Sequence, residues 1–205
     1  MSRTIDHVVF YDIEHLTIAD SPSRFWNGPQ DPDPTVVQIG AVRLSCESPF
    51  DFGETLDLVV VPRDRFGARA ALSPFFTDFT GITEARIDRD GLSLEDAYRR
   101  LDEFSAGSRL YAWGKDELNL MAVSAYVHGI TPTLPIGRFA SACDLLLASG
   151  VSLDETSRLR SHTILAHFGL KSEGERDHDG LSDARCVARA VQHLLRSGRL
   201  DPKRL

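Results

Sequence analysis

The chain has 205 residues, of which 42% are hydrophobic and 26% are charged, and its formal net charge at pH 7 is −7. These values are typical of a soluble globular protein with enough apolar material for one domain core. No apolar run of about 18 residues is present, which argues against a membrane span. The acidic balance argues against a broad electrostatic clamp on duplex nucleic acid.

The N-terminus and the cysteines bear on location. The N-terminus lacks the apolar core of a signal peptide. Cys46, Cys143 and Cys186 are far apart and in no paired metal-binding spacing, which favours free thiols in a reducing compartment. We therefore expect a single domain over residues 1–205 and a cytoplasmic location.

Three strands are expected in the N-terminal part. Residues 7–11 form an apolar run of the kind found in strands buried on both faces, and residues 36–44 and 54–61 follow it. Four prolines between residues 19 and 34 exclude regular structure there, so we expect a long loop. Two strands that come directly after the first suggest an antiparallel meander.

Helices and strands alternate in the rest of the chain. We expect, in chain order, a loop with short helical turns over 72–83, a helix capped by Ser93, a strand over 109–113, a helix over 116–128, a strand over 138–143, a short helix over 145–148, and helices over 156–168 and 181–195. This order predicts an α/β protein with one mixed sheet and helices packed on its faces.

Acidic residues follow two of the apolar strands. Asp12 and Glu14 come directly after the first and, being two residues apart, project from the same face of an extended chain. The end of a buried strand is where ligand sites of α/β proteins usually form. Taken alone, the pair also fits a solvated strand end. Asp116 follows the 109–113 strand at a helix start, where interaction with the helix dipole alone would account for it, and its neighbour Glu117 can take the same role.

Two further candidates lie near the C-terminus. Asp183 continues the apolar stripe of the last helix, so its carboxylate is expected to point toward the sheet and to need compensation there. His178 lies in a charged, glycine-containing stretch. Such a histidine is usually a solvent-exposed loop residue, but a loop position also suits a general base.

Electrostatics limits what these residues can do together. Two carboxylates about 4 Å apart repel by roughly 4 kcal/mol at an effective dielectric constant near 20, so a cluster of four would require bound cations. Ligand sets made only of oxygen favour Mg²⁺ or Mn²⁺. Two such ions would clamp a phosphodiester, and His178 would take the proton from the attacking water.

The chain resembles the DEDDh 3′–5′ exonuclease family. The residues that carry the resemblance are Phe10-Tyr-Asp12-Ile-Glu14, Trp113-Gly-Lys-Asp116, and His178 followed five residues later by Asp183; the segment 72–83 is similar to the family's "LTGIT" loop. The Trp-Gly pair is most similar to the branch that contains the histone-mRNA and small-RNA trimming exonucleases, alongside ribonuclease T and polymerase proofreading subunits.

The resemblance implies a ribonuclease H-like fold, with a mixed five-stranded sheet and helices on both faces. It also implies a 3′–5′ exonuclease that releases nucleoside 5′-monophosphates from single-stranded RNA or DNA and uses two divalent cations, Mg²⁺ or Mn²⁺. The site residues that it implies are Asp12, Glu14, Asp116 and Asp183 as metal ligands, His178 as general base, and His15, Leu16, Thr80, Gly81 and Ile82 as contacts of the terminal nucleotide.

The sequence departs from the family pattern at three places. Family spacing from Gly114 leads to Glu117, whereas residue type favours Asp116; we prefer Asp116 and keep Glu117 as the alternative. His15 is bulkier than the usual small residue after the first motif. The Pro-rich segment of residues 19–34 has no obvious counterpart and is a substrate lid, an oligomer contact or a long loop.

The alternative function is a catalytically silent module on the same fold that binds nucleic acid or protein. The presence of every candidate catalytic residue counts against it. The motifs do not separate RNA from DNA as substrate, although the Trp-Gly pair favours RNA. Family members often form homodimers, but the sequence contains no coiled-coil pattern that decides the oligomeric state. No membrane partner is expected.

Overall fold

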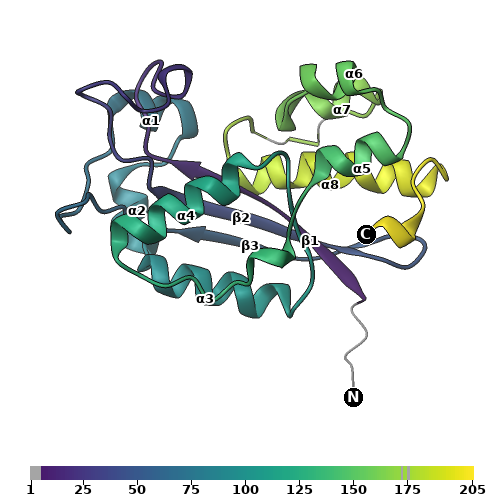
Figure 1. Cartoon of the computed structure of the whole chain (residues 1–205), viewed down its shortest axis with the longest axis horizontal. Helices are drawn as coiled ribbons and strands as arrows, with labels where there is room; N and C mark the ends of the chain where they lie inside the picture. The colour runs from purple at the N-terminus through teal and green to yellow at the C-terminus, as the bar shows by residue number, and fades with distance from the viewer. Residues whose placement is uncertain (1–5, 172, 175) are drawn as a thin grey trace.

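A mixed five-stranded sheet forms the centre of the computed structural model, which describes residues 6–171, 173–174 and 176–205 (Figure 1). The strands are β1 His7–His15, β2 Val36–Ser45, β3 Phe52–Val59, β4 Leu110–Ala112 and β5 Phe139–Ser141, in the spatial order β3-β2-β1-β4-β5. β1 pairs antiparallel with β2 and parallel with β4. The prediction of a mixed five-stranded sheet is confirmed.

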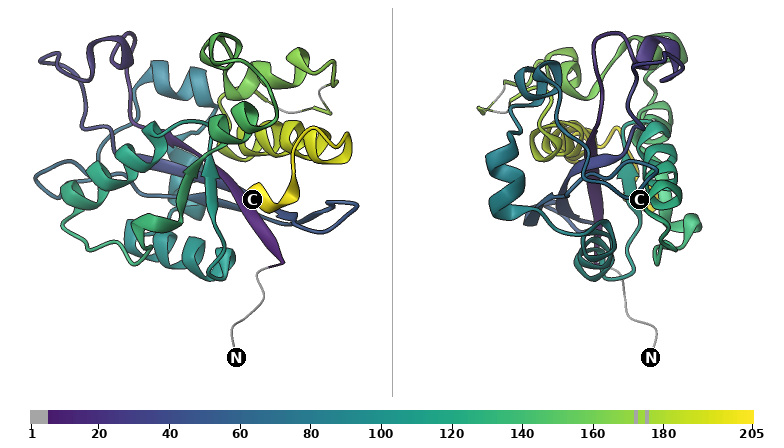
Figure 2. Two further views of the ribbon diagram at one scale, coloured as in Figure 1. Left: turned by 45° about the vertical axis from the view of Figure 1, so that its right-hand side comes forward. Right: turned by 90° about the vertical axis from the view of Figure 1, so that its left-hand side faces the viewer.

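Helices cover both faces of the sheet, as predicted (Figure 2). They are α1 Pro74–Thr80, α2 Glu84–Asp90, α3 Leu94–Ser105, α4 Asp116–His128, α5 Ala142–Ala148, α6 Leu153–Arg158, α7 Ile164–His167 and α8 Gly180–Arg196. Among the described residues, no helix has the length and apolar character needed to cross a membrane.

The alternation of β1 divides the core into two layers. Val8 and Phe10 pack with α5, α7 and α8 on one face, whereas Val9 and Tyr11 pack with α3 and α4 on the other. A third apolar cluster lies beneath α1 and α2, and its buried members are Leu16, Val37, Val59, Phe76, Ile82 and Ile87. This cluster fixes α1 at the end of β1 where the acidic residues lie.

The segment expected as a loop with short helical turns forms α1. The Ser73 side chain accepts a hydrogen bond from the backbone of Phe76, Pro74 occupies the first turn, and Gly81 ends the helix at a φ of 74°. These are the residue types that helix ends favour. The next helix, α2, was not predicted; it is only 7 residues long and is capped by Thr83.

The prediction of one helix over residues 156–168 is wrong. A capping box between Ser152 and Glu155 starts α6 earlier, and the chain then becomes extended at Arg160 before a 3₁₀ turn and α7. Thr163 Oγ1 accepts a hydrogen bond from the Arg160 backbone. Local bonds of this kind compete with a continuous helix.

A close approach of α8 to β2 sets the position of the last helix. A Cβ atom at Gly40 would lie 2.0 Å from the backbone nitrogen of Leu181, so only glycine fits there. The buried side chain of Gln38 accepts a hydrogen bond from Gly180 N–H and donates to Asp179. Both contacts hold the first turn of α8 against the sheet.

Candidate functional site

Three carboxylates converge at the end of β1. Asp12, Glu14 and Asp183 each offer an oxygen within 4.8 Å of the other two. Asp12 and Glu14 extend from one face of β1, and Asp183 comes from the first turn of α8. Glu14 is 7% exposed and Asp183 is 4% exposed, so these two residues have little access to water, whereas Asp12 is half-buried. Residues 169 positions apart in the chain meet because α8 packs so closely on β2.

Burial and mutual repulsion disfavour the ionised form of these acids. Burial, followed by the charge of Asp183, raises the pKa of Glu14 to about 8. Burial raises the pKa of Asp183 to about 7, and burial together with neighbouring carboxylates raises the pKa of Asp12 well above its usual value. Asp183 Oδ1 is buried and has no hydrogen-bond partner among the described residues. Carboxylate oxygens at this spacing, with one of them buried and unpartnered, fit a hard divalent cation.

Asp116 and Glu117 are placed differently at the start of α4. Glu117 is 6% exposed, and its Oε2 is buried with no partner in the described part of the chain. Asp116 is exposed, and its side chain turns back toward Gly114. Its Oδ1 lies 2.7 Å from the position that a Cβ atom on Gly114 would occupy. After burial itself, the charge of Glu117 contributes most to the raised pKa of Asp12. The residue preferred from the sequence, Asp116, is thus the more exposed of the two.

His178 lies beside the acidic cluster in a left-handed conformation, with a φ of 59°. Its backbone hydrogen-bonds the Asp183 carboxylate and so lowers the pKa of that acid. Its ring stacks on the ring of Phe79 at a centroid distance of 3.7 Å. The ring of His162 lies tilted to the same imidazole at a centroid distance of 5.5 Å. Burial, and then the charge of His162, lower the pKa of His178. The imidazole is therefore mainly neutral at pH 7, as a base must be.

An aromatic row continues from His178 along α1. Phe75 stacks on Phe79 at 5.4 Å, and the two side chains are 38% and 39% exposed. His162 comes from the 3₁₀ turn Ser161–Thr163 and was not singled out in the sequence. No sequence signal marks it, because the broken helix places it at the site.

The 80–82 segment contributes less side-chain surface than expected. Thr80 is 2% exposed and donates to Phe76 O, and Ile82 is fully buried in the cluster beneath α1 and α2. Arg176 covers Gly81, since a Cβ atom at Gly81 would lie 1.9 Å from the guanidinium. Arg176 is thus a cationic neighbour of the site that the sequence analysis missed, although the charged stretch around His178 was noted.

His15 and Leu16 follow the acidic pair directly. Leu16 is 3% exposed and packs in the cluster beneath α1 and α2. Both ring nitrogens of His15 are buried and have no partner among the described residues. Burial lowers the pKa of His15 to about 4, although the negative charge of Asp116 acts in the other direction and raises it. The indole of Trp26 meets the His15 ring edge-on at 5.2 Å.

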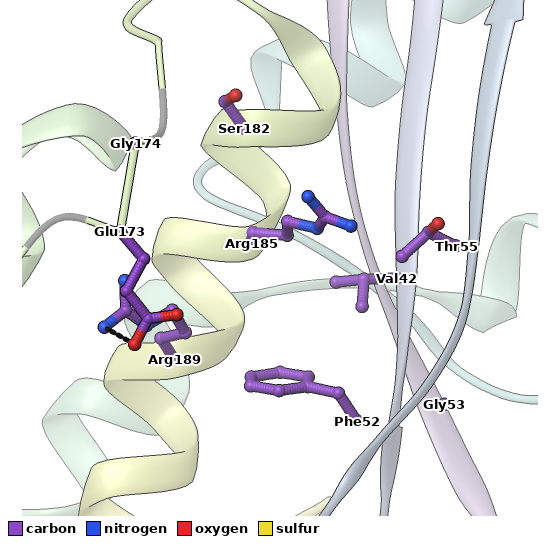
Figure 3. Close-up of a pocket in the computed structure, with 9 residues that line it drawn as sticks. All are labelled: Val42, Phe52, Gly53, Thr55, Glu173, Gly174, Ser182, Arg185 and Arg189. Atoms are coloured by element: carbon purple, nitrogen blue, oxygen red, sulfur yellow. Dashed lines mark hydrogen bonds and ion pairs between the residues drawn. The ribbon is translucent and has the colours of Figure 1, made fainter.

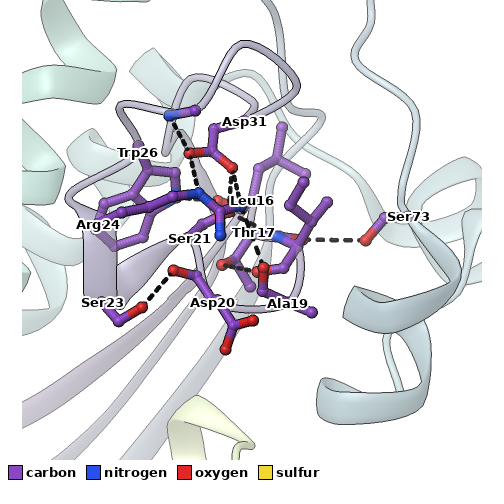
Figure 4. Close-up of polar contacts among 12 residues, drawn as sticks. Leu16, Thr17, Ala19, Asp20, Ser21, Ser23, Arg24, Trp26, Asp31 and Ser73 are labelled. Atoms are coloured by element: carbon purple, nitrogen blue, oxygen red, sulfur yellow. Dashed lines mark hydrogen bonds and ion pairs between the residues drawn. The ribbon is translucent and has the colours of Figure 1, made fainter.

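The Pro-rich segment is an ordered loop (Figure 4). Its only regular piece is the 3₁₀ turn Pro22–Arg24. The Asp31 side chain is fully buried and accepts hydrogen bonds from Ser21 Oγ, from the Arg24 guanidinium and from Gly28 N–H. Charge-assisted bonds that converge on one carboxylate give the loop a defined shape.

A groove of about 380 Å³ runs along the other side of α8, facing β3 (Figure 3). Arg185 extends into it beside Thr55, and an ion pair between Arg189 and Glu173 lies at its edge. Its lining residues are Val42, Phe52, Gly53, Thr55, Glu173, Gly174, Ser182, Arg185 and Arg189. None of the acidic-cluster carboxylates lines it.

Sequence comparisons give no relatives: no family model matches the chain, and no curated protein matches it. Solved structures do match. A full-length 3′-exonuclease is similar at 18% identity and a TM-score of 0.74, over 95% of this chain and 62% of that one. The zinc-bound E. coli exonuclease I–ssDNA complex is similar at 15% identity and a TM-score of 0.62, over 94% of this chain and 41% of that one.

Exonuclease I from Methylocaldum szegediense is similar at 17% identity and a TM-score of 0.58, over 94% of this chain and 40% of that one. The chain therefore spans less than two thirds of each of these proteins. The identities are low, so the likeness concerns architecture. The chain has the ribonuclease H-like α/β fold that these exonucleases share.

Proposed function

We propose that the protein is a metal-dependent 3′–5′ exonuclease that removes nucleoside 5′-monophosphates from single-stranded nucleic acid. The observation that carries this proposal is the convergence of Asp12, Glu14 and Asp183 within 4.8 Å. Buried acids that meet without a cationic side chain between them are costly unless a cation completes the site. The likeness in fold to 3′-exonucleases supports the same assignment.

The acidic cluster would hold two divalent cations, Mg²⁺ or Mn²⁺, with one more carboxylate from the start of α4. We assign that fourth position to Glu117, because its Oε2 is buried without a partner among the described residues, and because its charge raises the pKa of Asp12 more than any other neighbouring carboxylate does. When bound, the cations would lower the pKa of an attacking water and stabilise the leaving 3′ oxygen. The carboxylates would orient the scissile phosphate indirectly, because they determine where the cations that attract it are held.

His178 would take the proton from the attacking water. Its neighbours support this role, because Phe79 and His162 contact the ring and the backbone of His178 hydrogen-bonds the Asp183 carboxylate. The lowered pKa of His178 keeps the imidazole free to accept a proton at neutral pH.

Single-stranded ends are the substrate that the surroundings favour. Phe75 and Phe79 present exposed ring surface next to His178, and unpaired bases stack on such surfaces. Duplex nucleic acid offers no free base faces, and the net charge of −7 disfavours a broad contact with its backbone. One neighbouring structure is itself an exonuclease complex with ssDNA.

The polarity of cleavage tests the proposal. Single strands of RNA and of DNA carrying a label at either the 5′ or the 3′ end are incubated with Mn²⁺, Mg²⁺ or EDTA. We expect a 5′ label to remain on progressively shorter fragments, and a 3′ label to be released at once as a mononucleotide, only with metal. Metal binding without cleavage of either polymer would instead indicate the silent binding module.

A further inference from the structure

The groove between α8 and β3 has a cationic wall, although the net charge of the chain is −7. It lies along β3, the edge strand of the sheet, and has a volume of about 380 Å³ (Figure 3). Ser182, Arg185 and Arg189 form one side of it, and their spacing of three and four residues places them on one face of α8. Phe52 and Thr55 come from β3 on the other side. A negatively charged ligand therefore meets a local cationic surface here.

Arg185 supplies positive charge that no described acid balances. Its side chain extends into the groove and has no hydrogen-bond or ion-pair partner among the described residues. Two acids on the flanking segments already have cationic partners, since Glu173 pairs with Arg189 and Asp57 pairs with Arg86. A guanidinium presents its N–H donors in a planar fork that matches the oxygens of a phosphate. Arg185 is thus available to an oxyanion that enters the groove.

The groove begins next to the acidic cluster. Ser182 at one end of it directly precedes Asp183 on α8, and the backbone N–H of Arg176 donates to Ser182 Oγ. The guanidinium of Arg176 lies against Gly81, so a second cation connects the groove with the site. From Ser182 to Arg189 the helix rises by about 10 Å, which corresponds to roughly two or three stacked nucleotides.

We propose that this groove binds the sugar-phosphate backbone of a single strand on the 5′ side of its terminal nucleotide, with Arg185 as a phosphate contact. The guanidinium would hold a phosphate by charge-assisted hydrogen bonds, and the hydroxyls of Thr55 and Ser182 would add neutral ones. Phe52, which is 39% exposed, offers a ring face to one base. This inference rests on the proposed exonuclease function and gives an acidic chain a local site for its polyanionic substrate.

The first test compares cleavage of a dinucleotide with cleavage of a dodecanucleotide, both made of the polymer that the wild type cleaves faster. Only the longer strand reaches the groove, so we expect its kcat/KM to exceed that of the dinucleotide by about tenfold or more. Arg185→Ala should remove most of this ratio, mainly through the KM of the longer strand. Arg185→Lys keeps the charge and should restore part of it. Arg100→Ala, the matched control, removes an exposed arginine of α3 on the opposite face of the sheet and should leave the ratio unchanged.

Binding gives a readout that does not depend on cleavage. Fluorescence anisotropy of a labelled dodecanucleotide measures the affinity of Asp183→Asn, with and without Arg185→Ala, in Mn²⁺ at increasing salt. One phosphate contact of a single strand contributes about 0.7 to the slope of log K against log[salt], so Arg185→Ala should lower the slope by about that amount. A chain-length ratio that survives in Arg185→Ala, or an unchanged salt slope, overturns this inference and leaves the exonuclease intact. Cleavage of neither substrate contradicts the proposed function instead, and the salt slope then decides whether the groove binds single strands.

Discussion

At the scale of single residues, the burial of the acidic cluster lowers the stability of the folded chain. Glu14 and Asp183 are buried together, and Asp183 Oδ1 has no hydrogen-bond partner in the part of the chain that the structure describes. Their raised pKa values express the cost of ionising them in the folded chain. A bound cation would reverse this cost, so stability, pH and metal are coupled through the same few oxygens.

The pH dependence of stability follows from these shifts. An acid whose folded pKa is raised holds its proton longer in the folded than in the unfolded state, so stability falls as pH rises through that interval. For Glu14 the interval runs from 4.5 to about 8. We expect the melting temperature in EDTA to fall between pH 5 and pH 8, by about 2–4 °C for each kcal/mol lost.

Mn²⁺ should offset the fall most at pH 8, where the ligands are ionised. Glu14→Gln should flatten the profile in EDTA and weaken the Mn²⁺ effect. Thermal denaturation across this range measures both effects, and a melting temperature in EDTA that rises toward pH 8 would contradict the reading of the acidic cluster.

The roles of Asp116 and Glu117 separate by mutation. Glu117→Gln removes a buried carboxylate beside Asp12 and is expected to lower kcat with Mn²⁺ by about 100-fold or more, together with metal affinity. Asp116→Asn changes an exposed residue at the same helix start and is expected to cost less than about tenfold. Steady-state kinetics and Mn²⁺ titration decide between them. The opposite order of effects would return the fourth position to Asp116.

At the scale of elements, the contact between α8 and β2 brings the site together. Gly40→Ala would place a methyl group against the backbone of Leu181 and push α8 away from the sheet. Overpacking of this kind costs about 1–3 kcal/mol, and Asp183 would leave the acidic cluster with its helix. We expect a lower melting temperature and a loss of activity larger than the loss of folded protein.

The matched control is Gly137→Ala. A Cβ atom there would meet nothing within 4 Å, so this variant should keep both stability and activity. Circular dichroism and the cleavage assay compare the two variants. Full activity in Gly40→Ala would show that the helix does not need this close approach.

The loop of residues 16–35 depends on Asp31. Asp31→Asn removes the charge that receives the Arg24 guanidinium and the Gly28 N–H, so the loop should open and be cut faster by trypsin at Arg24. Asp20→Asn changes an exposed acid of the same loop and serves as the control. Because the pKa of Asp31 is lowered, mainly by Arg24, its contribution is present at neutral pH and is lost as the solution becomes acidic. Equal cleavage of both variants would contradict this account of the loop.

The elements that the sequence predicted well are those with an unambiguous apolar period. The strands and α3, α4 and α8 fall within a few residues of their expected ranges, because each combines a core-facing pattern with clear end signals such as Ser93 and Gly129. At the break, Arg160 N–H donates a local hydrogen bond to Thr163 Oγ1, and the apolar period of a sequence does not detect such a bond. The short helix α2 is too brief to produce a period.

At the scale of the whole molecule, the order of motifs predicted the meeting of Asp12, Glu14 and Asp183, but neither the exposed position of Asp116 nor the arrangement of the neighbouring residues. Sequence patterns identified Asp12, Glu14 and Asp183 because each lies on a strand or helix whose core-facing side can be recognised from its apolar residues. Adjacent side chains at a helix start point about 100° apart, so a small shift in where the helix begins changes which of the two faces the site. Contacts such as Trp26 on His15 join a loop to a strand and lie beyond any local pattern.

The most direct measurement of the central claim is the release of mononucleotides from a single-stranded RNA by the wild type and by Asp183→Asn, each in Mn²⁺ and in EDTA. The acidic cluster predicts nucleoside 5′-monophosphates from the wild type only with Mn²⁺, and a loss of about 100-fold or more in the variant, whose fold should persist because Asp183 is replaced by a near-isosteric amide. Release that continues in EDTA, or a variant as active as the wild type, would show that the chemistry does not depend on this cluster.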